Sequence, residues 1–383
     1  MNSDDPRHEP TFKKWLKEIG FRVVPKNIND SASYSNDRAA SEGRFISNVT
    51  SAKWYHVDKV NYFFDGPIEL HLIAVLWIMF EGRLLDIQLG KECYGARLEY
   101  SAGKPGDRSA GLFRRYHELY AEWRDLAINK AKQLLTEDHA SVCILGLDLQ
   151  EFYYYIQLNY DAIARSVYEA SIEESENLEA KESPSNLLEC LNAICIKYRK
   201  TIGPFLQITH GDMLSSDAGI PIGLCSSPLL ANWHLQNFDK AVKTIVRPAY
   251  YGRYVDDILL VIPVPADPSK DGQPVEAFMN HVLVKPGLLH KLKDERYEIA
   301  EHTGLFLKQS KCILQYFDAK HSIAGLEKFK KKLEKNASDF LLMPVDEADS
   351  SLEDVAYELL YEGSVNKFRS VKGMAENRYE LAK

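Results

Sequence analysis

The sequence has no long hydrophobic run. Its longest apolar stretch, residues 72–80, is far shorter than the roughly 20 apolar residues that a membrane-spanning helix requires. Residues 1–20 are charged and polar, and they lack the apolar core and small-residue cleavage site of a secretory signal peptide. Because both features are missing, we expect a cytoplasmic protein with no membrane partner.

Paired cysteines are missing as well. None of the six cysteines belongs to a Cys-x-x-Cys pair, and none has a histidine at the spacing of a zinc site. The cysteines therefore predict reduced thiols, several of them buried, and they exclude a disulfide scaffold and a zinc module. They are Cys93, Cys143, Cys190, Cys195, Cys225 and Cys312.

The sequence also has no excess of positive charge. It contains 47 lysines and arginines against 55 aspartates and glutamates, a formal net charge of -8. This balance excludes a protein that coats itself in nucleic acid by bulk attraction, so any nucleic-acid groove must be locally basic. The basic clusters that could line such a groove are equally typical of solvated helix faces. They are Arg114 with Arg115; Lys197, Arg199 and Lys200; and Lys328, Lys330, Lys331, Lys332 and Lys335.

What the sequence does contain is enough apolar material for a large core. The 383 residues are 45% hydrophobic, which suits two domains or one core with helical lobes. Residues 1–50 are polar and predict a partly ordered lead-in with a short helix near residues 12–19. Residues 51–140 repeat apolar side chains at a period near 3.6 and predict a mainly helical region.

Residues 141–325 predict a mixture of strands and helices. The compact apolar run of residues 141–149 ends in an acid and is typical of a buried strand. Residues 250–262 predict two short strands that meet at a polar tip, and residues 312–317 predict another strand.

Three further segments complete this division. Residues 171–186 are acidic, rich in serine and interrupted by proline, and they predict a surface insertion. Residues 288–303 predict a helix. Residues 326–383 are charged and mostly helical in pattern, so we expect a helical end region. No helix stop signal precedes Lys383, and one alternative is that this region continues in a longer protein.

Three acidic residues stand at the ends of the predicted strands. Asp148 closes the first buried strand, and Asp256 and Asp257 form the polar tip of YGRYVDDILLV. Adjacent acids between apolar flanks repel each other unless a cation or hydrogen bonds compensate them. Phosphoryl transfer by two divalent cations, about 3.5–4 Å apart, requires oxygen ligands from at least two acids. The acids form such a site if the two strands lie side by side; a turn-capping Asp148 and a structural hairpin turn are the alternative.

The motifs around these acids resemble those of reverse transcriptases. The segment YVDD matches the Y-x-D-D signature, LGLDLQEFYYY resembles the first palm motif, and GIPIGLCSSPLLAN resembles the second, in the family's order. Ile222 stands where many members have glutamine. In this respect the sequence resembles the bacterial abortive-infection and defence-associated (unknown-group) reverse transcriptases. The resemblance is firm over residues 141–317.

The resemblance implies an α+β right-hand polymerase with an antiparallel palm sheet at residues 141–325. Residues 51–140 would be fingers-like, and residues 326–383 would be a partial helical thumb or a linker. It further implies an RNA-directed or template-independent DNA polymerase that uses Mg²⁺ or Mn²⁺ and dNTPs and serves anti-phage defence. The implied partners are an RNA or DNA template and primer or a non-coding RNA, and priming on a protein hydroxyl is compatible with the resemblance.

The family's site residues map onto this sequence through the same motifs. Tyr153 would be the steric gate, because a ring beneath the sugar clashes with a ribose 2′-hydroxyl and so favours deoxynucleotides. Phe152, beside it, would also belong to the nucleotide site. Alternatively, Phe152 to Tyr155 only pack the start of a helix. Ile222 and Gly223 would contact the template or the nucleotide base. The implied metal ligands are three carboxylates and one main-chain carbonyl: Asp148, Asp256, Asp257 and Leu149.

The remaining assignments concern phosphates and nucleic acid. Arg97 lies in YGARL, which is similar to an element of the defence group, and would contact the triphosphate or the template. Arg253 and Tyr254 would contact nucleic acid. Lys311 in FLKQSK resembles the lysine of the fourth motif, which can protonate the departing pyrophosphate; an isolated surface lysine is the alternative.

Two other functions stay open on the sequence alone. A catalytically silent palm could serve as a scaffold for nucleic acid or a partner protein, although all three acids are present. A palm with the same carboxylates could also synthesise RNA or cyclise nucleotides, which Tyr153 and the YxDD hairpin disfavour. The sequence leaves the template, the trigger and the oligomeric state open, a homo-oligomer included.

Overall fold

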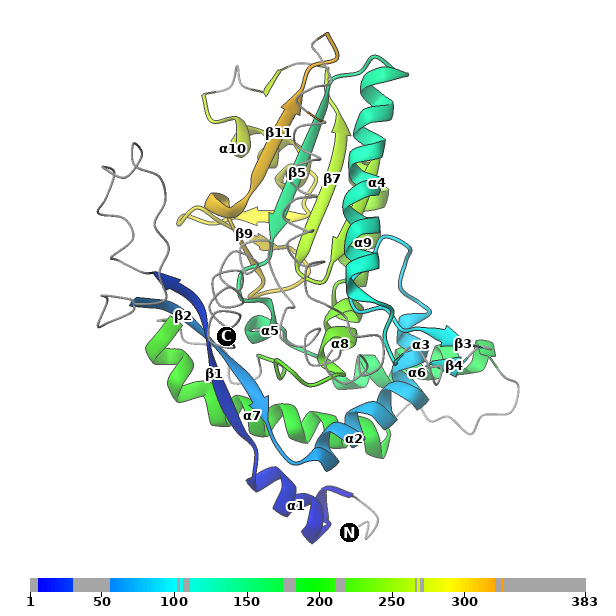
Figure 1. Ribbon diagram of the computed structural model, residues 1–383, viewed down its shortest axis with the longest axis vertical. Helices are drawn as coiled ribbons and strands as arrows, with labels where there is room; N and C mark the ends of the chain where they lie inside the picture. Colours follow the sequence, from blue (N-terminus) through cyan, green and yellow to red (C-terminus); the bar gives the residue numbers. More distant parts are fainter. Residues whose placement is uncertain are drawn as a thin grey trace, which may run out of the picture.

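The chain folds into a mixed α+β structure with antiparallel sheets, shown in Figure 1. This agrees with the predicted α+β class. No helix in the described part of the chain is long and apolar enough to cross a membrane. The computed structural model describes residues 6–29, 56–101, 104–105, 111–174, 184–210, 218–265, 267–268, 272–320 and 326.

A four-stranded antiparallel sheet forms the centre of the structure. The strand order is β11-β5-β7-β6, so β5 and β7 are the inner pair. The strands predicted within residues 141–149, 250–262 and 312–317 are therefore confirmed. Their bounds are β5 Val142–Asp148, β6 Tyr250–Tyr254, β7 Asp257–Pro263 and β11 Ile313–Phe317.

Helix α4 (Tyr116–Thr136) covers one face of this sheet and runs beside β7 in Figure 1. The small side chain of Ala131 lets the helix approach the sheet closely, and Val142 and Ile144 of β5 pack in the same apolar cluster. Successive side chains of a strand point to opposite faces, so Leu145 points away from α4 into the larger core on the other side. Both faces of the inner strands are thus covered.

The larger core is mainly helical. Helix α6 continues to Glu174, and α7 begins at Asn186, so the surface insertion predicted for residues 171–186 is narrower than expected; residues 175–183 lie outside the described residues. The elements in this part are α5 Phe152–Tyr155, α6 Tyr160–Glu174, α7 Asn186–His210, α8 Ser227–His234, α9 Gln236–Ala241 and the π-helix η4 Val242–Val246.

The N-terminal region contains two strands that the sequence analysis did not predict. Helix α1 (Pro10–Lys17) confirms the short helix, but β1 (Gly20–Asn29) and β2 (His56–Asp65) then pair as an antiparallel ribbon. They fall in the supposed lead-in of residues 1–50 and the supposed mainly helical residues 51–140. β1 contains a proline and a bulge that break its alternating pattern, which hid it from pattern analysis.

A nearly continuous helix follows β2. It consists of α2 (Ile68–Trp77), the π-helix η3 (Ile78–Gly82) and α3 (Arg83–Asp86). A Cβ atom at Gly82 would lie 2.8 Å from Cδ2 of Leu229, so the glycine allows this helix to pack closely on α8. The π-turn therefore falls at a close helix contact.

A second sheet replaces a predicted helix. Residues 288–303 form β8 and β9 instead, because Gly287 with φ +83° ends the preceding helix and the buried Leu289, Tyr297 and Ile299 then follow strand spacing. The bounds are α10 Pro274–Met279, π-helix η6 Asn280–Val284, β8 Leu289–Lys291, β9 Arg296–Ile299 and β10 Phe306–Lys308.

The C-terminal region is described at one residue. Of the predicted helical region 326–383, only Leu326 is described, and it is buried in the cluster beneath α4. The predicted thumb-like region otherwise lies outside the described residues. The short elements are the 3-10 helices η1 Pro6–His8 and η7 Gln309–Lys311 and the strands β3 Tyr100–Ser101 and β4 Lys104–Pro105.

The contact between α4 and the sheet can be tested with one methyl group. A Cβ at Gly252 of β6 would clash with the hydroxyl of Tyr250, which donates to the carbonyl oxygen of Trp123, and would lie 2.8 Å from Cδ1 of Trp123. We therefore expect Gly252→Ala to lower the free energy of unfolding by about 1–3 kcal/mol. At Gly146 of β5 the nearest atom would be 3.6 Å away, and Gly146→Ala should leave stability unchanged or raise it by up to about 1 kcal/mol. Denaturant unfolding of both variants measures the difference, and equal effects would contradict the described packing.

Candidate active site at the ends of strands β5 and β7

Two acidic side chains meet at one end of the central sheet. Asp148 is the last residue of β5 and Asp257 is the first of β7, and the antiparallel register pairs them directly. Side chains of directly paired residues point to the same face, with Cβ atoms about 4.5–5.5 Å apart. The two strands lie side by side, as the sequence prediction required.

Asp256 occupies the turn that joins β6 to β7. Its carbonyl oxygen accepts a hydrogen bond of 3.1 Å from the N–H of Leu149, the residue that follows Asp148. This bond ties the turn to the end of β5. The four residues predicted as metal ligands therefore lie in one place, although the strands that carry them are far apart in the sequence.

Val255 gives the turn its shape. Its φ of +55° lies in the left-handed region, which is unfavourable for a β-branched residue. Nη1 of Arg253 donates a hydrogen bond of 2.9 Å to the carbonyl oxygen of Val255. Gly95 packs against the turn so closely that a Cβ there would lie 2.6 Å from Cγ2 of Val255. The surrounding structure thus holds a conformation that the turn would not adopt alone.

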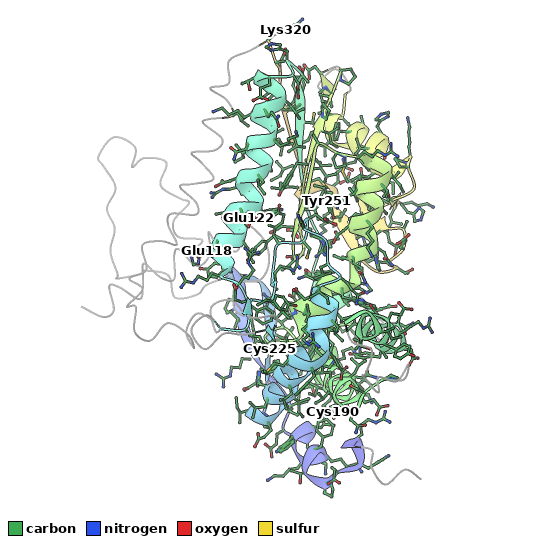
Figure 2. All side chains as sticks on the ribbon, turned by 90° about the vertical axis from the view of Figure 1, so that its right-hand side faces the viewer. Glu118, Glu122, Cys190, Cys225, Tyr251 and Lys320 are labelled. Carbon is green, nitrogen blue, oxygen red and sulfur yellow. The ribbon has the colours of Figure 1, made fainter. Side chains whose placement is uncertain are left out.

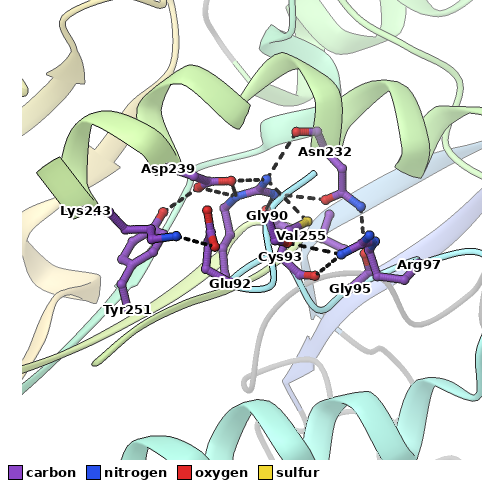
Figure 3. Close-up of polar contacts among 11 residues, drawn as sticks. Gly90, Glu92, Cys93, Gly95, Arg97, Asn232, Asp239, Lys243, Tyr251 and Val255 are labelled. Atoms are coloured by element: carbon purple, nitrogen blue, oxygen red, sulfur yellow. Dashed lines mark hydrogen bonds and ion pairs between the residues drawn. The ribbon is translucent and has the colours of Figure 1, made fainter. Parts of the chain in front are cut away.

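Figure 3 shows the polar cluster that supports this turn. Arg253 is 0% exposed, and its guanidinium forms an ion pair of 2.7 Å with Asp239. It also donates to Oδ1 of Asn232 at 2.9 Å, and the hydroxyl of Tyr251 donates to Oδ1 of Asp239 at 2.5 Å. Burial disfavours the charged guanidinium, but Asp239 outweighs it and raises the pKa of Arg253.

This cluster corrects the prediction for Arg253. All three nitrogens of its guanidinium group donate hydrogen bonds inside the core, to Asp239, Asn232 and Val255 among others. A contact with nucleic acid is therefore wrong for this residue. Its neighbour Cys93, which it also contacts, is a buried thiol whose pKa burial raises to about 11.

Arg97 is also turned inward. Its Nε donates to Oδ1 of the buried Asp86 at 2.9 Å, and its Nη1 donates to the carbonyl oxygen of Cys93 at 3.0 Å. Nη2 donates to the carbonyl oxygen of Asp86 at 3.0 Å. These bonds fix the loop that brings Gly95 against the YVDD turn. The contact of Arg97 with a triphosphate or template stays a prediction.

Lys311 lies beside one of the predicted metal ligands. Its Nζ forms an ion pair of 2.6 Å with Oδ2 of Asp148. Two contacts produce this arrangement: Leu149 forms a bridge with Leu307 of β10, and β11, which begins after Lys311, pairs with β5. Burial and then the charge of Asp148 raise the pKa of the adjacent Cys312 thiol to about 12. The predicted general acid and the predicted metal ligand are thus in direct contact.

Strand β2 holds the second motif. The N–H of Phe64 donates to the carbonyl oxygen of Ile222 at 2.7 Å, and Phe63 forms a parallel bridge with Ile222. Gly223 has φ +96°, and a Cβ there would lie 3.3 Å from Cδ1 of Phe63. A side chain at this position would therefore be strained and crowded. The N-terminal ribbon is a structural support of the site that the sequence analysis missed.

The first motif continues into the short helix α5. Phe152 and Tyr153 are both buried, with their ring centroids 5.9 Å apart. The N–H of Ile220 donates to the carbonyl oxygen of Tyr153 at 2.8 Å, which links the first motif to the second. Phe152 fits the packing alternative, because it is 1% exposed in the core. The gate function of Tyr153 stays a prediction.

Aromatic side chains of α4 lie beside the acid pair. The ring of Tyr254 is 5.4 Å from that of Tyr120 and 6.0 Å from that of Trp123, and its hydroxyl donates to the carbonyl oxygen of Tyr116 at 3.3 Å. Burial and then the charge of Asp257 raise the pKa of Tyr120. These α4 aromatics were not among the predicted site residues, although their spacing of three and four residues places them on one helix face. The nucleic-acid contact of Tyr254 stays a prediction.

The donor atoms at this site suit a hard divalent cation. The carboxylates of Asp148, Asp256 and Asp257 and the carbonyl of Leu149 are the oxygen ligands that Mg²⁺ prefers. Among the described residues, however, no group of three or more acidic, histidine or cysteine side chains is arranged to hold a metal ion. Lys311 already binds one oxygen of Asp148. The residues therefore fit such a cation in kind, and binding requires Lys311 to share or release Asp148.

Comparison with known proteins adds no family assignment. No model of a known protein family matches the sequence, and no curated protein matches it either. The site must therefore be interpreted from its own geometry.

The buried ion pair beneath the turn predicts a strong effect on stability. We expect Arg253→Met to lower the free energy of unfolding by about 3–5 kcal/mol, because it leaves the carboxylate of Asp239 buried without its counter-charge. The double variant Arg253→Met with Asp239→Leu should recover part of this loss. Urea unfolding of the three proteins gives the coupling between the two residues. Additive effects would show that the pair does not act as a unit.

Proposed function

We propose that this protein is a nucleotidyltransferase that synthesises DNA, either directed by RNA or without a template. The observation that carries the proposal is the direct pairing of Asp148 with Asp257, next to Asp256 in a strained turn. The resemblance to reverse transcriptases rests on the same residues. A right-hand polymerase fold, with residues 141–325 as its palm, is part of the proposal.

The carboxylates of the three acids would hold two divalent cations, with the carbonyl oxygen of Leu149 as a further ligand. When bound, Mg²⁺ or Mn²⁺ supplies charge stabilisation for the attacking oxygen and the leaving phosphates. The protein contributes the rigid placement of the ligands. The hydrogen bond from Leu149 to the turn and the support from Arg253 fix the carboxylates before substrate arrives.

Lys311 has two functions in this proposal. Its ammonium group neutralises Asp148 through the 2.6 Å contact, which keeps the charge of Asp148 compensated beside Asp257. In the reaction, Nζ would donate a proton to the departing pyrophosphate, as the resemblance implies. Its side chain is about one-third exposed, so it can turn from Asp148 toward a substrate.

Tyr153 would select deoxynucleotides. It follows the acid-bearing strand by one short turn, and its main chain is bonded to the second motif. A ring held there from both sides is rigid enough to exclude a ribose 2′-hydroxyl.

We place the activity in the cytoplasm, with a template and primer or a non-coding RNA as partner and anti-phage defence as its setting.

A scaffold without catalysis is the second candidate. The ion pair between Lys311 and Asp148 favours the scaffold if this contact is a permanent structural one. The strained conformation of Val255 favours the enzyme, because such strain persists where the surrounding structure enforces it and is concentrated at functional sites.

The activity can be measured with purified protein, Mg²⁺ or Mn²⁺, and labelled dNTPs or NTPs, with and without a primed RNA template. We expect a DNA product, and we expect Asp148→Asn and Asp256→Asn each to reduce its formation at least about 1,000-fold, equivalent to several kcal/mol of lost charge stabilisation. Asp138→Asn, at an exposed acid outside the site, is the matched control and should retain full activity.

The product identifies the type of polymerase. DNA that requires the template indicates a conventional reverse transcriptase, and DNA made without it, particularly if attached to protein, indicates a defence-type polymerase. Full activity in Asp256→Asn would refute the site assignment. Absence of product with every nucleotide set, together with bound nucleic acid, would favour the scaffold.

Sugar selection gives a separate prediction. Tyr153→Ala should raise the incorporation of ribonucleotides relative to deoxynucleotides by about 10-fold or more, because it removes the ring expected to exclude the 2′-hydroxyl. Tyr153→Phe keeps the ring and should keep the selectivity of the wild type. Competition between labelled dNTP and NTP measures the ratio. Equal ratios in the Ala and wild-type proteins would assign Tyr153 to packing alone.

Lys311 should influence metal binding and catalysis in opposite directions. Lys311→Met removes the group that competes for Asp148, so Mn²⁺ should bind about 3- to 10-fold more tightly, as read from the electron paramagnetic resonance signal of free Mn²⁺. DNA synthesis should fall about 100-fold with the loss of the proton donor. Lys308→Met, at an exposed neighbouring lysine, is the control. Unchanged Mn²⁺ affinity in Lys311→Met would contradict the competition.

A further inference from the structure

Helix α2 and the π-helix η3 expose an apolar ridge. Five large apolar side chains on these two elements are exposed to solvent, with Ile68 65% exposed and Phe80 63% exposed. The first four are spaced three or four residues apart, and the last two are adjacent in the sequence. Residues three and four apart on a helix lie on one face, so the five form a continuous stripe about 18 Å long. The ridge consists of Ile68, Leu72, Leu76, Met79 and Phe80.

The opposite face of the same helix is buried. Leu70, Ala74 and Trp77 are 0% exposed and pack in the main core, where α2 lies against α7. A helix that is apolar all round is normally buried on every side. Single exposed apolar residues need no explanation, but a contiguous stripe of five marks an interaction surface. None of the five ridge residues is among those that form the candidate active site.

The charges at the two ends of the ridge are complementary to each other. Glu69 stands beside its first residue and Arg83 follows its last, and both are partly accessible. Leu76 is midway between these two in the sequence. If a second copy of the helix packs antiparallel with its two-fold axis at Leu76, Glu69 of one copy lies level with Arg83 of the other. The same operation brings Leu72 level with Phe80.

We propose that this ridge, from Ile68 to Phe80, is the two-fold interface through which two copies of this chain associate. The central contact is apolar, with Leu76 facing its own copy across the axis, and a Glu69–Arg83 pair closes each end. Such an isologous arrangement uses one patch twice and stops at a dimer. The apolar centre supplies the burial, and the end charges set the antiparallel orientation.

The test is the mass of the full-length protein in solution, by analytical ultracentrifugation over a range of concentrations. We expect a dimer whose dissociation constant rises at least about 100-fold in Leu76→Glu, because two carboxylates would then meet at the axis inside an apolar contact. Ile208→Glu, at an apolar side chain of α7 that is 80% exposed and lies off the ridge, is the matched control and should leave the dimer unchanged. Circular dichroism confirms that both variants fold.

A charge exchange tests the two-fold geometry itself. Glu69→Arg and Arg83→Glu should each weaken the dimer, and the double variant should restore it, since each new cation again faces a new anion of the other copy. A monomer at all concentrations, a dimer insensitive to Leu76→Glu, or a different protein bound at the ridge would each overturn the proposal. A dimer that fails to recover in the double variant would overturn the antiparallel register.

Discussion

The ion pair between Arg253 and Asp239 is the interaction on which the acid site depends. A guanidinium buried without a carboxylate is strongly unfavourable, so the strand that carries Arg253 and the helix that carries Asp239 must come together for the core to form. The same guanidinium then bonds to the carbonyl oxygen of Val255 and holds the turn in its left-handed conformation. The ion pair that stabilises the core therefore also fixes the positions of Asp256 and Asp257.

Support for the site comes from parts of the chain that lie far from its acids. The loop fixed by Arg97 and Asp86 brings Gly95 against the turn, and β2 bonds to the segment of Ile222. Figure 2, turned by 90° from the first view, shows Tyr251 beside the central sheet, with Cys225 and Cys190 in the helical part below it. Contacts from several separate elements therefore hold the turn that carries Asp256, while Asp148 and Asp257 lie at the ends of paired strands.

The sequence predicted those parts of the fold whose pattern is local. Continuous apolar runs identified β5 and β7, and the acids at their ends were found because adjacent carboxylates between apolar flanks are unusual. The burial of Arg253 could not be predicted, since nothing near it in the sequence points to Asp239. The predicted helix at residues 288–303 failed because Gly287 ends the helix earlier, and β1 escaped notice because its partner lies beyond a long intervening segment. For Arg253 and for β1 the missing information was a contact between residues far apart in the sequence, whereas for residues 288–303 it was the local backbone conformation of Gly287.

The order of the central sheet has a consequence for the synthesis of the protein. β5 is the first of the four strands to be made, but one of its neighbours, β11, is the last, and the contact of Asp148 with Lys311 spans 163 residues. A ribosome adds about 5–20 residues per second, so β5 waits for many seconds with one edge unpaired. An apolar strand with an open edge readily pairs with other chains. Newly made chains are thus exposed to aggregation during this interval, which would make their yield sensitive to translation speed and to chaperones that cover apolar strands.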